Sequence, residues 1–208
     1  MYERLLLEAQ SRHDISAFLA YIFMVLPTAE YVDRLAVLDV QDDDSQELKQ
    51  MIAFIKSCES TDEVLQSILL DRTQLLRGTQ RDGAKPPYES LYRRIHQSVL
   101  FSDLYTFYRD AGIMLTEEAH TTPDFLGSEI AFIEAVSQKE IEALHAGDST
   151  EANRLRGIQE KFFSQHLSSW LEDVSAEIDA HAQTDFFKGV AALLREYSTS
   201  NNAGEDMD

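Results

Sequence analysis

The residue pair best suited to metal chemistry is Glu142 and His145, which form a Glu-x-x-His motif one helical turn apart. Paired motifs of this kind on inward-facing helices build carboxylate-bridged metal sites. The remaining histidines follow no zinc-ligand spacing. They are His13, His96, His120, His166 and His181. We therefore expect these histidines to be surface or hydrogen-bonded core residues, and we expect no metal ion and no cofactor.

Nucleophilic chemistry finds little support in the sequence. The single cysteine, Cys58, can form neither an internal disulfide nor a thiolate cluster, and no neighbouring residue marks an activating base. The sequence contains no G-x-G-x-x-G motif, no P-loop and no G-x-S-x-G motif. We therefore expect a protein that is not an enzyme.

The segment KPPYESLYRRI, residues 85–95, permits two interpretations. A proline suits the first position of a helix, and Glu89 favours a helix N-terminus. Tyr88 and Tyr92 lie one helical turn apart. The segment is thus either a plain helix start or a place where a ligand or partner is held, and the local pattern leaves both open.

The balance of charge excludes one class of partner. The chain has 37 acidic and 18 basic residues, a net charge of −19. Such a protein repels phosphate backbones, so we expect no nucleic-acid binding. An acidic surface favours basic partners, but it also serves simply to keep a protein soluble.

The apolar stretch ISAFLAYIFMVL, residues 15–26, has the length of a signal-peptide core. The residues before it carry a net negative charge, and no A-x-A pattern follows Pro27. The stretch is also too short to span a bilayer. We expect a buried helix, no membrane insertion and a cytoplasmic protein.

Hydrophobic periodicity predicts an all-α protein, and 8 Gly and 4 Pro are too few for a protein with many β-turns. In the first half we expect a helix that ends before Pro27, a helix in 30–40, a helix capped by Asp43 or Asp44, and a helix capped by Ser60 or Thr61. A loop at 77–87 follows, and then helical periodicity over 88–112 with Gly112 as C-cap. In the second half we expect a helix begun by Thr122, Pro123 and Asp124 that ends at Gly147, one or two helices in 148–182, and a last helix in 184–197.

The chain resembles the TorD/DmsD family of cytoplasmic chaperones for molybdenum-containing oxidoreductases. The resemblance rests on the order and spacing of degenerate blocks along nearly the whole chain. These blocks are AFLAYIFMVLPTAEYVDRL, LLDRTQLLRG followed by KPPYESLYR, TPDFLGSEIAFIEAV, and FFSQHLSSWLEDV.

The family's signature, E-P-x-D-H, is matched here by Thr121, Thr122, Pro123, Asp124 and Phe125. Only the aspartate is retained, because Pro123 stands at the variable position and Phe125 replaces the histidine. The resemblance implies a signal-peptide or client-binding site, which we assign to two segments. Its residues are Tyr88, Glu89, Tyr92, Thr122, Pro123, Asp124 and Phe125.

The resemblance also implies a compact multi-helix TorD-like bundle with two helical halves joined near residues 112–124. We expect a single domain over 1–197, with halves 1–120 and 121–197, followed by a disordered acidic tail over 198–208. The implied partner is the precursor or catalytic subunit of a molybdenum oxidoreductase, bound through a twin-arginine signal peptide or through the mature subunit, by a monomer or homodimer. The alternatives are a helical adaptor with an unrelated protein client and, with less support, a metal-dependent enzyme.

Overall fold

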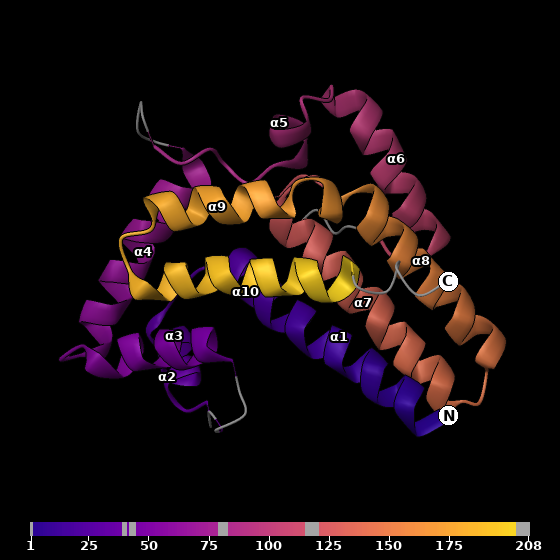
Figure 1. The fold of residues 1–208 in the computed structure, drawn as a ribbon, viewed down its shortest axis with the longest axis horizontal. Coiled ribbons are helices and arrows are strands. Elements are labelled where there is room, and N and C mark those ends of the chain that lie inside the picture. Colours follow the sequence, from indigo (N-terminus) through magenta and orange to yellow (C-terminus); the bar gives the residue numbers. More distant parts are fainter. Residues whose placement is uncertain (1, 39–40, 42–44, 79–82, 115–120, 203–208) are drawn as a thin grey trace. The chain divides into compact units, whose positions relative to one another are not determined.

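The computed structural model of the chain describes residues 2–38, 41, 45–78, 83–114 and 121–202. Regular structure in these ranges is helical, and their only pairing of extended segments is a single antiparallel bridge between Tyr88 and Phe125 (Figure 1). The expected all-α class is confirmed. No helix in this part of the chain is long and apolar enough to cross a bilayer.

The helices have the following bounds: α1 Tyr2–Met24, α2 Ala29–Ala36, α3 Gln46–Ser57, α4 Thr61–Arg77, α5 Glu89–Arg93, α6 Gln97–Asp110, α7 Leu126–His145, α8 Ser149–Gln165, the 3-10 turn η2 Leu167–Ser169, α9 Leu171–His181 and α10 Asp185–Asn202.

The chain forms two compact units, each built from separate stretches of sequence. Unit 1 comprises the described parts of residues 1–25, 88–170 and 201–208, and unit 2 comprises those of 26–87 and 171–200. Each unit therefore draws on both of the halves expected at 1–120 and 121–197. Within the segment expected to join the two halves, near residues 112–124, residues 115–120 lie outside the described ranges.

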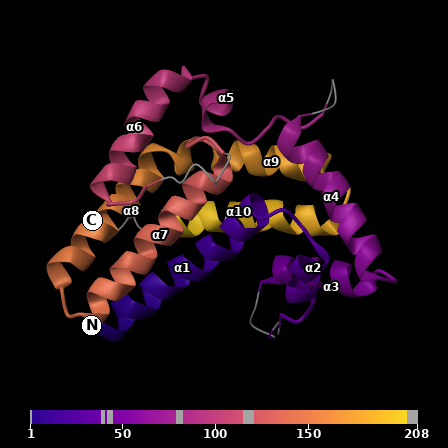
Figure 2. The same ribbon diagram turned by 180° about the vertical axis from the view of Figure 1, so that it is seen from behind.

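Unit 1 is organised around α7, which packs along α1 on one side and α8 on the other; the three run side by side in both views (Figures 1 and 2). The end of α1 meets the start of α7 closely. A Cβ at Gly127 would lie 2.9 Å from both the Phe23 Cβ and the Met24 Sδ. Behind this contact, aromatic rings fill the core, with the rings of Phe132 and Phe162 4.4 Å apart.

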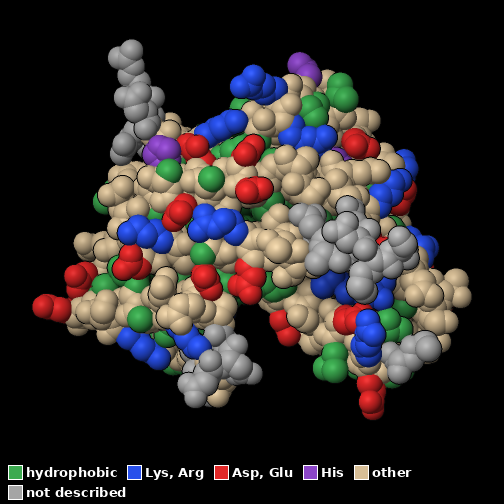
Figure 3. Space-filling view, viewed as in Figure 1, with side chains coloured by type: hydrophobic (Ala, Val, Ile, Leu, Met, Phe, Trp, Pro, Cys, Tyr) green, Lys and Arg blue, Asp and Glu red, His purple; other side chains and the backbone are tan. Residues whose placement is uncertain are grey.

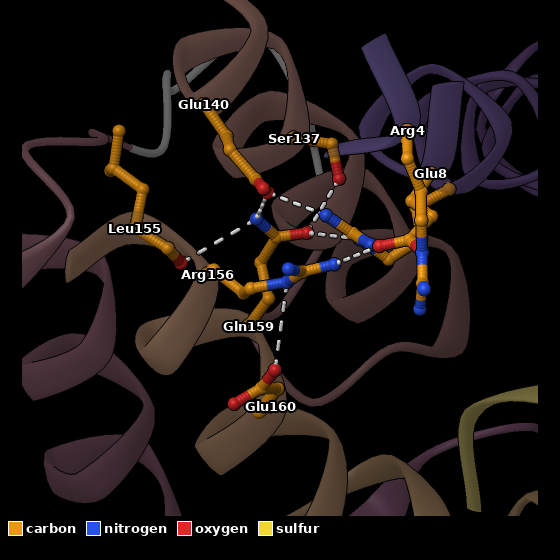
Figure 4. Close-up of polar contacts among 9 residues, drawn as sticks. Arg4, Glu8, Ser137, Glu140, Leu155, Arg156, Gln159 and Glu160 are labelled. Carbon is orange, nitrogen blue, oxygen red and sulfur yellow. Dashed lines mark hydrogen bonds and ion pairs between the residues drawn. The ribbon is translucent and has the colours of Figure 1, made fainter. Parts of the chain in front are cut away.

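Buried polar side chains fix the register of these three helices (Figure 4). Arg12 of α1 donates to Glu140 of α7 over 2.7 Å, and Gln159 of α8 donates to the same carboxylate oxygen over 2.7 Å. Ser137 donates to the Gln159 side-chain oxygen over 2.7 Å. Because buried polar groups must find partners, only one alignment of the three helices satisfies all of them.

Unit 2 is held by a buried carboxylate at the start of α10. Both oxygens of Asp71, on α4, accept hydrogen bonds from the Gln183 N–H over 3.1 Å, and one also accepts from the Thr184 N–H over 2.8 Å and the Thr184 hydroxyl over 2.7 Å. Thr184 in turn accepts from the Phe187 N–H and so caps α10. Because free N–H groups gather at a helix N-terminus, a carboxylate there joins α4 firmly to α10.

Several expected helix ends are confirmed. Ser60 caps α4 by accepting from the Glu63 N–H over 3.3 Å. Gly112 and Gly147 follow α6 and α7 with φ of +63° and +74°, the left-handed conformation that glycine adopts without strain.

Other helix ends differ from the expectation. Ser45 caps α3, and the expected caps Asp43 and Asp44 lie outside the described residues. The stretch 88–112, for which the sequence predicts helical periodicity without an internal break, contains two helices, because Arg94 adopts φ +56° and ends α5. Residues 198–202, assigned to the tail, are helical, and the rest of that segment lies outside the described residues.

Candidate functional site

The two segments that carry the candidate residues lie against each other in unit 1. Tyr88 and Phe125 pair as an antiparallel bridge, and their rings are 5.5 Å apart. The Glu89 N–H donates to the Asp124 carbonyl oxygen over 2.8 Å. Residues distant in the sequence are thus brought together at the start of α5 and just before α7.

Asp124 is fully buried, and its carboxylate is satisfied within the chain. One oxygen accepts from the Ser90 hydroxyl over 2.6 Å and the other from the Thr122 hydroxyl over 2.5 Å. Two charge-assisted bonds of this length hold a buried carboxylate well. No accessible oxygen is left for an arginine of a client.

The turn that contains Asp124 replaces the expected helix start. The Phe125 N–H donates to the Thr122 carbonyl oxygen over 3.2 Å, which makes Thr122–Phe125 a β-turn with Pro123 at its second position. Phe125 is the N-cap of α7, and the helix begins at Leu126. The prediction that Thr122 caps the helix and that Asp124 lies in its first turn is wrong, since Thr-Pro-Asp suits a turn equally well.

Glu89, the first residue of α5, lies in a buried ion-pair cluster. His166, at the end of α8, has its Nδ1 3.0 Å from both Glu89 oxygens, and Arg93 donates to the same carboxylate. Burial by itself would raise the pKa of Glu89, but the hydrogen bonds and charge of His166 and the hydrogen bond from Arg93 outweigh it and lower the pKa. Glu89 is therefore ionised, and the His166 Nδ1 carries a proton, because a carboxylate can only accept.

The pKa of Glu129, on the first turn of α7, shifts in the opposite direction from that of Glu89. Its side chain is fully buried, and neither oxygen makes a hydrogen bond of ordinary length and geometry. Burial, followed by the nearby negative charge of Glu89, raises the pKa of Glu129 well above its usual value. The cluster thus favours the ionised form of Glu89 and the neutral form of Glu129, as expected where two acids share a buried site.

The outer edge of this cluster reaches solvent at Asp103, on α6. A carboxylate oxygen of Asp103 lies 3.5 Å from the His166 Nε2, which is longer than an ordinary hydrogen bond, and the Asp103 side chain is 59% exposed. His166 therefore lies between a buried carboxylate and a solvated one. The cluster joins α5, α6, α7 and α8 within unit 1.

The exposure of the candidate residues divides them into two groups. Glu89, Pro123, Asp124 and Phe125 are buried, whereas Tyr88, Tyr92 and Thr122 are half-buried. The ring of Tyr92 lies 5.4 Å from that of Trp170, which is buried behind it. Tyr88, Tyr92 and Thr122 are thus the members available to a partner, and a client-binding role for all seven remains a prediction.

Sequence reasoning missed the side chains that support these residues. His166 was only one of several unclustered histidines, and Glu129 and Trp170 gave no motif. Their role depends on contacts between elements, for example the separation of 77 positions between Glu89 and His166. An acidic residue at an inward position of the periodic helix 125–147 was the one available signal for Glu129.

The residues considered for metal or nucleophilic chemistry take no part in the contacts described for this site. Glu142 and His145 are both exposed, and Glu142 accepts a hydrogen bond from Gln138 over 3.0 Å. Cys58 is the half-buried C-cap of α3, and burial raises the pKa of its thiol. Within the described ranges, no three His, Cys, Asp or Glu side chains are close enough to hold a metal ion.

Comparison with known proteins relates the chain to a family and to a curated protein. The family described as "Nitrate reductase delta subunit" matches residues 39–176, more than half of the 208-residue chain. A protein of Dechloromonas aromatica (strain RCB) named "Perchlorate reductase assembly chaperone protein" is 28% identical over 116 residues, which cover 53% of this chain and 51% of that protein. The chain thus spans about half the length of the curated relative it matches. The match over 39–176 confirms the resemblance drawn from the sequence blocks, and the chain belongs to the nitrate reductase delta subunit family of TorD-like chaperones.

Proposed function

We propose that this protein is a cytoplasmic maturation chaperone that binds the catalytic subunit, or its precursor, of a molybdenum-cofactor oxidoreductase. It assists cofactor insertion and, where the client carries a twin-arginine signal peptide, delays export. It is a binding protein and not an enzyme. Family membership and the printed name of the Dechloromonas relative support this proposal.

The observation that carries the proposed site is the junction of residues 88–92 with residues 122–125. These segments match two separate blocks of the family resemblance, and the Glu89 to Asp124 backbone bond and the Tyr88–Phe125 bridge join them. A fixed backbone beneath partly exposed tyrosines suits a binding surface, because little conformational entropy is lost when a partner is bound. We call the exposed part, formed by Tyr88, Leu91, Tyr92, Arg94 and Thr122, the α5 surface.

The buried acids limit how a twin-arginine peptide could bind. Glu89 and Asp124 are already paired inside the chain and are inaccessible. The basic part of such a peptide would therefore meet solvated carboxylates of this strongly acidic chain, and not the signature aspartate. The α5 surface is better suited to a segment with apolar side chains.

Co-purification tests the proposal. The chain and the catalytic subunit of a molybdenum reductase from the same host are co-expressed, and the amount of subunit retained is measured. We expect retention by the wild-type chain, strong loss in Tyr92→Ala and Tyr88→Ala, and no loss in the control Tyr105→Ala, which removes a tyrosine that is 51% exposed on α6. Equal retention by all three variants would show that the α5 surface is not the site, and failure of every molybdenum reductase subunit to bind would overturn the proposed function.

A further inference from the structure

Arg94 has an unusual backbone conformation. It is the only residue other than glycine with positive φ in the part of the chain that the structure describes, at φ +56°. Its own N–H and that of Ile95 both bond to the Ser90 carbonyl oxygen and so end α5. Glycine or asparagine adopts this conformation at little cost, whereas an arginine carries a steric penalty. The cap explains the backbone but leaves the choice of side chain unexplained.

The Arg94 side chain is exposed, and it makes no hydrogen bond or ion pair with any residue in the described ranges. The neighbouring Arg93 is different, because it is paired with Glu89 and donates to the Gln165 carbonyl oxygen over 2.9 Å. Glycine or asparagine at position 94 would close α5 without strain. A strained and unpaired arginine suggests that the side chain serves a contact outside the chain.

Basic side chains lie at the surface near α5 (Figure 3), and three of the acidic side chains close to it are buried. Glu89, Asp124 and Glu129 are fully buried. Figure 3 shows Lys or Arg side chains and a His side chain gathered over α5 and the beginning of α6. One acid of the cluster is solvated: Asp103, whose carboxylate lies 3.5 Å from the His166 Nε2. A partner that approaches α5 therefore meets exposed basic side chains (Figure 3), although the chain as a whole carries a net charge of −19.

Apolar side chains accompany this charge. Leu91 is 45% exposed, and Tyr88 and Tyr92 are half-buried. Tyr88 is the N-cap of α5, and Leu91 and Tyr92 lie within the helix, so all three belong to the same short segment. Tyrosine, arginine and a large aliphatic residue are the types that dominate binding energy at protein interfaces.

We propose that Arg94 pairs with a carboxylate of the client, and that the segment bound at the α5 surface is apolar and acidic. This inference rests on the proposed function and names the chemistry of the bound segment. A basic segment at the same place would bring like charges together, whereas a carboxylate would accept hydrogen bonds from the planar guanidinium fork. The arginine pair of a signal peptide would then bind elsewhere on the chain.

The test uses synthetic helical peptides that share Leu and Phe at helical spacing and differ only in a flanking residue, which is Glu, Gln or Arg. Affinities are measured by calorimetry for the wild-type chain, Arg94→Asn and Arg94→Lys. Arg77→Gln is the control, since it removes an exposed arginine from the end of α4. Because the net charge of the chain acts on every variant alike, the informative quantity is the ratio of the Glu-peptide affinity to the Arg-peptide affinity.

We expect Arg94→Asn to lower this ratio about fivefold, the effect of one ion pair near a surface. Arg77→Gln should leave it nearly unchanged, and Arg94→Lys, which keeps the charge but not the guanidinium fork, should lower it less than Arg94→Asn does. The midpoint of thermal unfolding of Arg94→Asn should equal or exceed that of the wild type, because asparagine tolerates the left-handed conformation. A ratio that does not change in Arg94→Asn, or an absence of binding by all three peptides, would overturn this inference. Co-purification of the catalytic subunit would still decide the proposed function separately.

Discussion

The backbone N–H of Glu89 donates to the carbonyl oxygen of Asp124 over 2.8 Å, and this bond ties the start of α5 to the turn before α7. The side chains of the same two residues face different partners: Glu89 meets His166 and Arg93, and Asp124 meets Ser90 and Thr122. The retained aspartate of the family signature is thus part of the frame beneath the α5 surface. It supports the half-buried Tyr88 and Tyr92 and is itself fully buried.

The first prediction concerns the stability of this frame. Asp124→Ala removes the acceptor of two hydrogen bonds and leaves the Ser90 hydroxyl without its partner, so the free energy of unfolding should fall by about 1.5–3 kcal/mol. Denaturant titration of Asp124→Ala, Ser90→Ala and the double variant measures it. The two changes should be coupled by about 0.5–3 kcal/mol, because the residues share a bond. Strictly additive effects would show that the 2.6 Å contact contributes nothing to stability.

The second prediction concerns pH and Glu129. The pKa of Glu129 is raised in the folded protein, so this group stabilises the fold fully only below the pKa of the unfolded chain, about 4.3. Its contribution is lost as the pH rises from there through the folded-state pKa, because over this range Glu129 ionises in the unfolded chain but stays protonated in the folded protein. The stability of Glu129→Gln relative to the wild type should therefore increase between mildly acidic and neutral pH, as measured by urea unfolding at a series of pH values. Parallel curves for the two proteins would contradict a raised pKa of Glu129 in the folded protein.

The third prediction is that removing His166 costs more stability than removing another histidine. His166→Ala removes one partner of a buried carboxylate, which should lower the free energy of unfolding by about 3 kcal/mol at neutral pH. The loss should shrink as the pH falls through the lowered folded-state pKa of Glu89, because a protonated carboxyl group no longer needs the imidazole. The control His181→Ala removes a half-buried histidine on α9 and should have a much smaller effect. Similar losses in both variants would argue against the ion pair.

Whether a feature of the fold can be predicted from the sequence depends on how far apart along the chain the residues that produce it lie. The helices and several of their ends were accessible because periodicity and caps are local: Ser60, Gly112 and Gly147 stand where their side chains or conformations require. The end of α5 at Arg94 was not accessible, since arginine has no preference for the left-handed conformation and neither glycine nor proline marks the site.

The candidate site was predicted only in outline. The two segments were found through the family resemblance, but which of their side chains are exposed depends on the bridge between Tyr88 and Phe125. The burial of Asp124 and the pairing of Glu89 with His166 arise from contacts between distant positions, and single-sequence patterns do not encode them. Thr-Pro-Asp was read as a helix start because the same residues favour both a cap and a β-turn.

The fourth prediction concerns a twin-arginine signal peptide. Its affinity for the chain should fall as salt rises, because attraction between a basic peptide and solvated carboxylates is screened over about 8–10 Å at ordinary ionic strength. Asp124→Asn should not change this affinity once the folded fraction is taken into account, because the carboxylate is buried. Calorimetry at two salt concentrations decides both points. A large loss of affinity in Asp124→Asn would mean that the peptide opens the turn and reaches the aspartate.

The central claim, that the protein matures a molybdenum reductase through its α5 surface, is tested most directly by the molybdenum content of the reductase. The catalytic subunit is purified from a host strain that lacks the chaperone and from the same strain supplied with the wild-type chain, Tyr92→Ala or Tyr105→Ala, and its molybdenum is measured by elemental analysis. The account predicts a subunit depleted of molybdenum without the chaperone or with Tyr92→Ala, and a loaded subunit with the wild-type chain or Tyr105→Ala. Full loading of the subunit in the strain that lacks the chaperone would contradict it.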